Sequence, residues 1–239
     1  MNHKAIAIIP ARGGSKRIPR KNLVDLGGKP LIAHSIISAK KSKYLNGRIF
    51  VSTEDSEIAR VAKKYGTQVR ARPHELATDK ATTLSVLKHA IGTLESQGLD
   101  FDTVVLLQAT CPFRKTSTID KSIKKLWGNW QKLDGVFSVK KTKFPPAWML
   151  RTKGKLLEFL YPNDFSQIRG QDLEKTYEID GVLYVLKKDL VIKSKDYPFA
   201  HGKTSYIISG KIESIDIDDE EDLEIAKSIE NRLRSEPLS

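Results

Sequence analysis

Hydrophobic and polar positions along this chain follow two different periods. Two runs, at residues 4–9 and 102–108, are apolar over most of their length and rich in β-branched residues. Such runs are typical of strands buried on both faces of a parallel sheet. Shorter apolar runs at residues 48–52, 68–71 and 135–139 predict three further strands.

Segments between these runs carry apolar residues three and four positions apart, the period of an amphipathic helix. Five such segments predict helices: residues 28–41, 53–66, 82–94 and 116–130, and one that includes Leu223, Ala226, Ile229 and Leu233. The alternation of strands and helices predicts an α/β fold with a doubly wound, mostly parallel sheet. Ligands of such sheets bind beyond the carboxyl ends of the strands.

The stretch from residue 144 to 171 has many apolar residues but no helical period. An apolar, irregular insertion in an α/β domain indicates an interface. A chain of 239 residues is long enough for one sizeable α/β domain with an insertion and too short for two large ones. We therefore expect a single domain over residues 1–239 with an irregular insertion at about residues 141–175.

Residues 6–22, IAIIPARGGSKRIPRKN, join the first strand to a strongly basic loop. The loop contains five cations and no acid: Arg12, Lys16, Arg17, Arg20 and Lys21. Gly13 and Gly14 can adopt backbone angles closed to other residues, so successive N–H groups can converge on phosphate oxygens, and Ser15 adds a hydroxyl. Lysines supply mobile charges, and Arg12 supplies a planar fork for two oxygens. The spacing is neither GxxxxGK[ST] nor GxGxxG, and the alternative is a solvated basic loop.

A second candidate site lies near the carboxyl terminus, where Asp216 and Asp218 alternate with Ile215 and Ile217. This alternation predicts a strand that sends both carboxylates to one side, an arrangement suited to a hard cation that bridges phosphate oxygens. We therefore expect Asp216 and Asp218 to bind Mg²⁺. The alternative is acidic charge at a helix N-terminus, which the helix dipole favours.

Composition excludes several classes of protein. Cys111 is the only cysteine, so an internal disulfide and a cysteine-based zinc site are excluded. The net charge of +12 also occurs in nucleic-acid-binding proteins, but no arginine-rich tail, zinc finger or aromatic RNA-binding motif accompanies it. Small anionic substrates explain the charge more simply, and we expect no nucleic-acid partner. No stretch approaches 18 apolar residues and no signal peptide is visible, which predicts a cytoplasmic protein without a membrane partner.

The basic loop resembles the opening motif of the CMP-N-acetylneuraminate synthetase family, the cytidylyltransferases that activate sialic acids. That motif runs P-A-R-G-G-S-K, I-P, K-N-L and G-K-P-L-I after a strand, and residues 10–32 contain all of it in order. The resemblance implies a nucleotide-diphospho-sugar transferase-like, Rossmann-type fold, with CTP and an acidic nine-carbon sugar as partners. It also implies that the insertion forms a homodimer. CTP would be bound by Arg12, Ser15, Lys21 and Asn22.

Two further segments resemble the family. Residues 72–79 are similar to its R-P-x-x-L-A-x-D segment, which implies nucleotide contacts for Arg72, Asp79 and Thr82; alternatively, Asp79 is a helix N-cap. Residues 106–114 are similar to its L-Q-x-T-S-P-x-R segment. There Gln108 would contact substrate, and the alternative for Arg114 is a surface ion pair. Cys111 occupies the usual serine position, and since nucleotidyl transfer needs no covalent step, we expect it to be structural.

Residues that would hold the sugar follow from two more matches. Residues 169–177 are similar to the family's R-x-Q-D-x-P-x-x-Y element, and residues 180–184 to its N-G-A-x-Y element. Sugar contacts are thereby implied for Arg169, Gln171, Asp180 and Tyr184, although Arg169 could also be a surface cation. Glu174 replaces the usual proline and Asp180 the usual asparagine. A carboxylate at Asp180 would repel the sugar acid, so either it contacts a hydroxyl or amide or the sugar is not N-acetylneuraminate.

These observations predict a cytidylyltransferase that transfers CMP from CTP to the anomeric hydroxyl of a nonulosonic acid and releases pyrophosphate. Lys21, Asp216 and Asp218 would be catalytic. One alternative is a cytidylyltransferase for another acid sugar, such as legionaminate, pseudaminate or an octulosonate. A non-catalytic nucleotide- or RNA-binding protein and a structural α/β interaction protein are the others.

Overall fold

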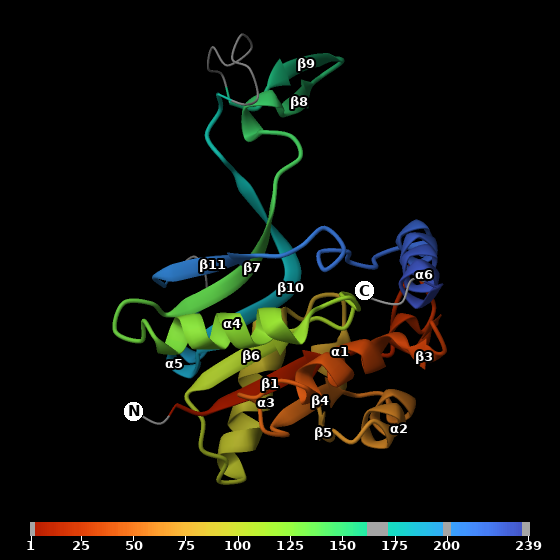
Figure 1. The fold of residues 1–239 in the computed structure, drawn as a ribbon, viewed down its shortest axis with the longest axis vertical. Helices are drawn as coiled ribbons and strands as arrows, with labels where there is room; N and C mark the ends of the chain where they lie inside the picture. The colour runs from red at the N-terminus through yellow and green to blue at the C-terminus, as the bar shows by residue number, and fades with distance from the viewer. Residues whose placement is uncertain (1–2, 162–171, 198–201, 236–239) are drawn as a thin grey trace.

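The structure, a computed structural model, describes residues 3–161, 172–197 and 202–235. Its centre is a seven-stranded sheet in the order β11-β7-β10-β6-β1-β4-β5 (Figure 1). The strands are β1 (Ala5–Pro10), β4 (Ile49–Thr53), β5 (Gln68–Ala71), β6 (Thr103–Leu107), β7 (Gly135–Lys141), β10 (Tyr177–Lys187) and β11 (Thr204–Ile208). Only β10 runs antiparallel to its neighbours in this sheet. The predicted mostly parallel sheet is confirmed.

Helices cover both faces of the sheet because the side chains of β1 alternate between two cores. Ala7 and Ile9 point into a cluster with α1 (Leu31–Lys40), α2 (Ser56–Lys64) and α4 (Thr116–Trp127). Ile6 and Ile8 point to the opposite face, where α3 (Thr83–Ser96) and α5 (Lys188–Lys193) pack. These four β1 side chains are fully buried, as expected for a strand at the centre of a doubly wound sheet.

A third, smaller core joins the basic loop to the carboxyl-terminal helix α6 (Glu220–Ser235). It also includes Leu26 of the short hairpin that β2 (Asp25–Leu26) forms with β3 (Lys29–Pro30). Ile18 from the loop and Ile217 from the segment before α6 are both buried here with Leu223. Leu233, expected on the inner face of α6, is exposed instead, since the helix extends beyond this small core.

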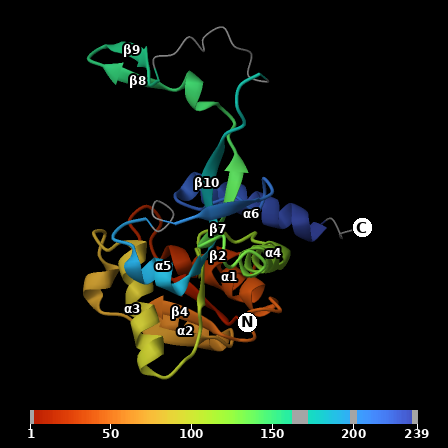
Figure 2. The ribbon, with the colours of Figure 1, turned by 90° about the vertical axis from the view of Figure 1, so that its left-hand side faces the viewer.

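An arm projects from the sheet, as Figures 1 and 2 show. The ends of β7 and β10 lead to it, and it contains a short 3-10 helix, η3 (Pro146–Trp148), and a hairpin of β8 (Leu150–Lys153) and β9 (Leu156–Phe159). The expectation of a wholly irregular segment is therefore wrong for the described part. Gly154, at φ +62°, allows the tight turn between the two strands. No helix among the described residues is long and apolar enough to cross a membrane.

Leu94 lies on α3, packs in the same core as Ile6 and Ile8 and is fully buried, whereas Ile225 on α6 is 52% exposed. We expect Leu94→Ala to lower the free energy of unfolding by about 2–5 kcal/mol, because it leaves a cavity in a packed core. Ile225→Ala, the matched control, should change it by less than about 0.5 kcal/mol. Chemical denaturation followed by circular dichroism measures both, and equal effects would contradict the packing described here.

Candidate functional site

The basic loop lies beyond the carboxyl end of β1, and several contacts hold it. The Gly13 N–H donates to Glu54 Oε1 at 2.7 Å, and Asn22 Nδ2 donates to the carbonyl of Arg12 at 2.9 Å. Ile18 anchors the far side of the loop in the third core. The N–H of Gly13 is thus already used, which corrects the expectation that it would face a phosphate.

Glu54 is the residue that sequence reasoning missed. Besides Gly13 it binds Arg72, whose Nε and Nη2 lie 3.0 and 2.9 Å from Glu54 Oε2 in a buried ion pair. Glu54 therefore ties the loop to the segment after β5. Its only signal in the sequence was its position directly after β4, the strand beside β1.

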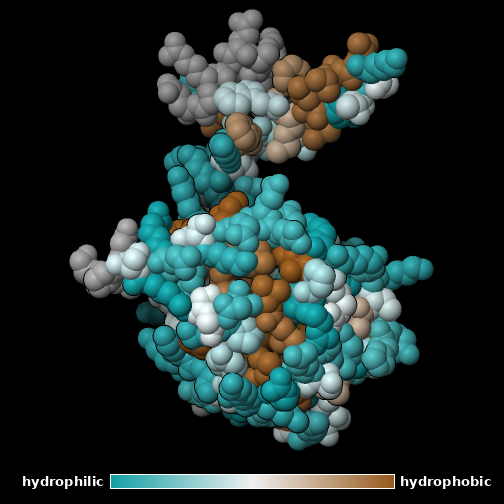
Figure 3. Space-filling model, turned by 90° about the vertical axis from the view of Figure 1, so that its right-hand side faces the viewer, coloured by the Kyte–Doolittle hydropathy of each residue, from teal (hydrophilic) through white to brown (hydrophobic). Residues whose placement is uncertain are grey.

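A cavity of about 500 Å³ opens beneath the loop. Figure 3 views the molecule from the side on which α6 and the β2–β3 hairpin lie, and hydrophobic residues there form a strip between hydrophilic borders. Nine residues expected at the site line this cavity: Arg12, Ser15, Lys16, Lys21, Asn22, Arg72, Asp79, Gln108 and Asp218. They come from segments far apart in the sequence, and Gly13 and Gly14 are not among the lining residues.

Each loop cation at this cavity is paired with a carboxylate. Lys21 Nζ donates to the carbonyl of Ile217 at 2.8 Å and to Asp218 Oδ1 at 3.1 Å. Arg12 Nη1 and Lys16 Nζ lie 2.8 and 2.6 Å from the two oxygens of Asp79. Hydrogen bonds from Lys16 and then Arg12 lower the pKa of Asp79.

Asp216 and Asp218 do not lie on a strand, which corrects the expected element. The segment is held by its middle residue instead: Ile217 is buried, and its N–H donates to the carbonyl of Thr110 at 2.9 Å. Asp218 is exposed to the cavity, whereas Asp216 is partly buried. Burial raises the pKa of Asp216, a hydrogen bond from Thr110 opposes this, and the charge of Asp218 adds to it.

Oδ1 of Asp216 is buried and has no hydrogen-bond partner among the described residues. A buried, unpartnered carboxylate oxygen next to a second carboxylate fits a hard cation. Within the described ranges no group of three metal-binding side chains occurs, but Mg²⁺ usually binds through one or two carboxylates and completes its shell with water and phosphate oxygens. The residues present therefore fit Mg²⁺.

A second cavity of about 410 Å³ adjoins the first, and Ala81, Thr83, Leu106 and Gln108 line both. Tyr184 lines the second cavity, and its hydroxyl forms a hydrogen bond with the side chain of Gln108. Burial raises the pKa of Tyr184 to about 12. Much of the remaining wall is apolar: Leu84, Leu87, Phe137 and Leu186. Thr82 lines this second cavity and not the first. Its hydroxyl caps α3 by accepting a hydrogen bond from the N–H of Ser85 at 3.1 Å.

The position of Gln108 depends on Arg114, which is buried and not a surface cation. Its guanidinium donates to the carbonyls of Val182 and Gln108, both at 2.6 Å, and to the hydroxyl of Ser35 at 2.9 Å. Arg114 forms no ion pair with a carboxylate of the described residues, and burial lowers its pKa. Nearby, burial raises the pKa of the Cys111 thiol to about 12, as expected for a structural residue.

Asp180 is 5% exposed and lines neither cavity. Its carboxylate accepts hydrogen bonds from the hydroxyls of Ser138 and Ser209 and from the N–H of Val182. The expectation that it would face the sugar is corrected: it stabilises a bulge in β10. Within this bulge Gly181, at φ +72°, brings its α-carbon so close that an added Cβ would lie 3.4 Å from Gln108 and 3.5 Å from Asp216. Arg169 and Gln171 lie outside the described residues.

Comparison with known proteins identifies relatives of this chain. The family model described as Cytidylyltransferase matches residues 6–145. The chain is 34% identical to the pseudaminic acid cytidylyltransferase of Campylobacter jejuni over 94% of its own length and 95% of that protein. It is 32% identical to the N-acylneuraminate cytidylyltransferase of Escherichia coli over its full length, but spans only 55% of that protein.

The fold is also found among solved structures. CMP:2-keto-3-deoxy-manno-octonic acid synthetase in complex with CTP superposes with a TM-score of 0.71 at 16% identity, over 96% of this chain and 99% of that one. At this identity the likeness concerns the fold alone.

The raised pKa of Asp216 predicts a pH-dependent effect on stability. Because the folded protein holds the proton more tightly than the unfolded chain, ionisation of Asp216 destabilises the fold as pH rises above the usual carboxyl range. In metal-free buffer, Asp216→Asn should therefore raise the free energy of unfolding at neutral pH, and the gain should vanish as pH falls below about 4. Denaturation at several pH values measures this, and a gain that is the same at all pH values would contradict it.

Proposed function

We propose a reaction for this chain, which belongs to the cytidylyltransferase family: transfer of CMP from CTP to the anomeric hydroxyl of a nonulosonic acid, with release of pyrophosphate. One observation carries the proposal. A cationic cavity and a mostly apolar cavity meet at Gln108. Two substrates bound side by side would bring a reacting hydroxyl and a phosphate together at that residue, as a transfer between them requires.

The triphosphate of CTP would occupy the first cavity. Arg12, Lys16 and Lys21 line it and converge from one loop, and such preorganised cations stabilise charge that develops on the α-phosphate and on departing pyrophosphate. Lys21 is the best held of the three, because its side chain is only 15% exposed and bonded to the carbonyl of Ile217.

The sugar acid would occupy the second cavity, with Tyr184 and Gln108 as hydrogen-bonding groups. Its anomeric oxygen attacks the α-phosphorus, the bond to the bridging oxygen of the β-phosphate breaks, and pyrophosphate leaves. The proton of the hydroxyl passes to a base, for which Asp218 at the cavity wall is our candidate. No covalent enzyme intermediate is needed.

Mg²⁺ would be held by Asp216 and Asp218, and when bound it would neutralise charge on the phosphate oxygens. Support comes from the unpartnered oxygen of Asp216 and from the hard-oxygen chemistry of both groups. Lys21 would then share Asp218 with the cation, which keeps the carboxylate oriented.

The relatives and the lining of the second cavity indicate which sugar acids the chain would accept. Relatives named for pseudaminic acid and for N-acylneuraminate have similar identity to this chain. The apolar wall of the second cavity supports a sugar acid with acyl or methyl groups, because hydroxyls placed there would lose hydrogen bonds to water. A cytoplasmic location stays a prediction.

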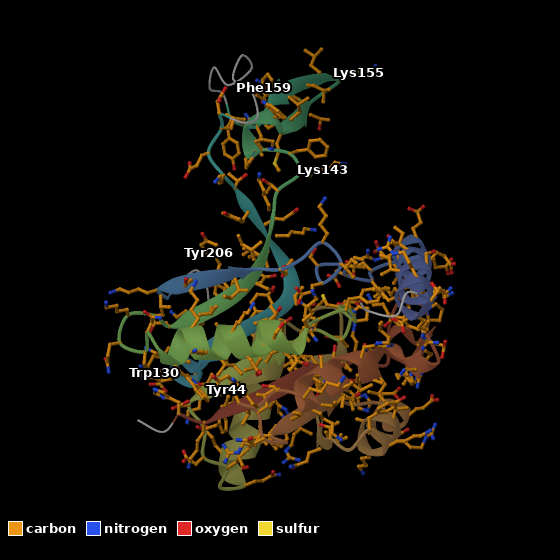
Figure 4. All side chains as sticks on the ribbon, in the orientation of Figure 1. Tyr44, Trp130, Lys143, Lys155, Phe159 and Tyr206 are labelled. Atoms are coloured by element: carbon orange, nitrogen blue, oxygen red, sulfur yellow. The ribbon has the colours of Figure 1, made fainter. Side chains whose placement is uncertain are left out.

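A homodimer formed through the arm is also part of the proposal. Large apolar side chains are exposed along it, including Leu156 at 74%, Leu157 at 67% and Phe144 at 60%. Figure 4 places Lys155 and Phe159 at the far end of the arm and Lys143 nearer the body. An apolar surface so far from the core has no partner within the described part of the chain, and a second copy would bury it.

The reaction is tested by pyrophosphate release from CTP and Mg²⁺ with N-acetylneuraminate, pseudaminate, legionaminate and an octulosonate. We expect release with CTP and at least one nine-carbon acid. Asp218→Ala should lower kcat by at least about 100-fold, because it removes a metal ligand and the candidate base. Asp100→Ala, the control, loses only an exposed ion pair with Lys4. Its kcat should stay within about twofold of that of the native enzyme. Near-native turnover by the Asp218 variant would contradict the assignment.

The dimer is tested by replacing Leu156 and Leu157 together with aspartate, which places two charges on the apolar surface. We expect the native protein to have the mass of two chains in light scattering and this variant the mass of one. Ile225→Asp makes the same kind of change at an exposed position of α6 and should remain dimeric. A native protein with the mass of one chain would rule out the dimer.

A further inference from the structure

Asp79 bridges the two sides of the first cavity. It follows the short helix η2 (His74–Ala77) and precedes α3, and from there its carboxylate reaches the loop after β1. One oxygen lies 2.8 Å from Arg12 Nη1 and the other 2.6 Å from Lys16 Nζ. A single carboxylate thus occupies two of the cations that a phosphate would use.

Neither local structure nor loop anchoring accounts for this contact. The cap of α3 is Thr82, so Asp79 is not needed to begin that helix. The loop is already held by Glu54, by Asn22 and by burial of Ile18. Asp79 itself is half exposed, and the side chain of Lys16 is 80% exposed. The ion pair therefore lies on the open side of the cavity, where a ligand can displace it.

We propose that Asp79 is a competitor of the phosphate and not a nucleotide ligand: an internal anion that occupies Arg12 and Lys16 until a highly charged phosphate displaces it. A carboxylate and a phosphate close to the same two cations repel each other, so one must leave. Only an anion with enough negative charge to displace Asp79 from Arg12 and Lys16 would therefore bind. This inference rests on the proposed function for the identity of the phosphate as the triphosphate of CTP.

The sign of one substitution separates this role from that of a ligand. Removing a ligand weakens binding, whereas removing a competitor strengthens it. Asp79→Asn keeps the size of the side chain and removes the charge, so it should bind sodium tripolyphosphate more tightly than the native protein does. We expect a gain of about three- to tenfold, the range for releasing two partly exposed ion pairs.

The experiment is calorimetric titration of the full chain with tripolyphosphate in low-salt buffer with a chelator. Asp79→Glu keeps the charge and should bind within about twofold of the native protein. Asp100→Asn is the matched control: its carboxylate also pairs with a lysine, Lys4, at 2.6 Å, but lines neither cavity. It should leave the dissociation constant unchanged. The gain for Asp79→Asn should shrink as salt is raised from about 0.05 to 0.5 M, because exposed charges are screened.

Unchanged or weaker binding by Asp79→Asn would overturn the inference, whatever the turnover of the enzyme. Tighter binding of tripolyphosphate without pyrophosphate release from CTP and any sugar acid would support the role of Asp79 and contradict the proposed function. Tighter binding by Asp100→Asn as well would show a general effect of net charge and would also overturn it.

Discussion

The buried guanidinium of Arg114 is the interaction on which the arrangement of the site depends. It joins the end of β6 through Gln108, α1 through Ser35 and the β10 bulge through Val182. A buried cation bonded to neutral acceptors is costly to leave unsatisfied, so all three contacts must form together. Gln108 lines both cavities, and the hydrogen bond from Arg114 to its backbone carbonyl fixes its position. The side chain of Gln108 remains available to ligands and to Tyr184.

Carboxylates organise the cationic loop, because without them the positive charges of its side chains would repel one another. Glu54 fixes the backbone, Asp79 holds Arg12 and Lys16, and Asp218 holds Lys21. The side chain of Glu54 is 9% exposed, whereas those of Asp79 and Asp218 are 50% and 52% exposed. This difference separates a permanent support from contacts that a ligand can replace, because exposed ion pairs contribute little to stability.

The sequence predicted five strands of the central sheet, β1, β4, β5, β6 and β7, and five helices, because a buried parallel strand and an amphipathic helix each have a distinct period. It did not predict β10, β11 or α5. It failed where tertiary contacts override the period. Asp216 and Asp218 alternate with isoleucines as in a strand, yet no described strand pairs with them. The segment is held by the burial of Ile217 and by the hydrogen bonds of its backbone with Thr110 and Lys21. The arm has too few residues per strand for a clear alternation, so its hairpin was not predicted. Asp180 was assigned to the sugar by position in a motif, but a bulge turned its carboxylate inward.

The sequence by itself determined the class of fold, the cationic loop and the residue types that can bind phosphate and a hard cation, since these follow from local pattern and motif order. Only the tertiary structure decided which of these groups already have a partner within the chain. Gly13 is bonded to Glu54, Arg12 and Lys16 to Asp79, and Arg114 to three neutral acceptors. The partners in these contacts are 41 to 79 residues apart along the chain, except for Arg114 and Gln108, which are 6 residues apart. No local period encodes such pairs, because they arise where separate strand ends meet at one edge of the sheet.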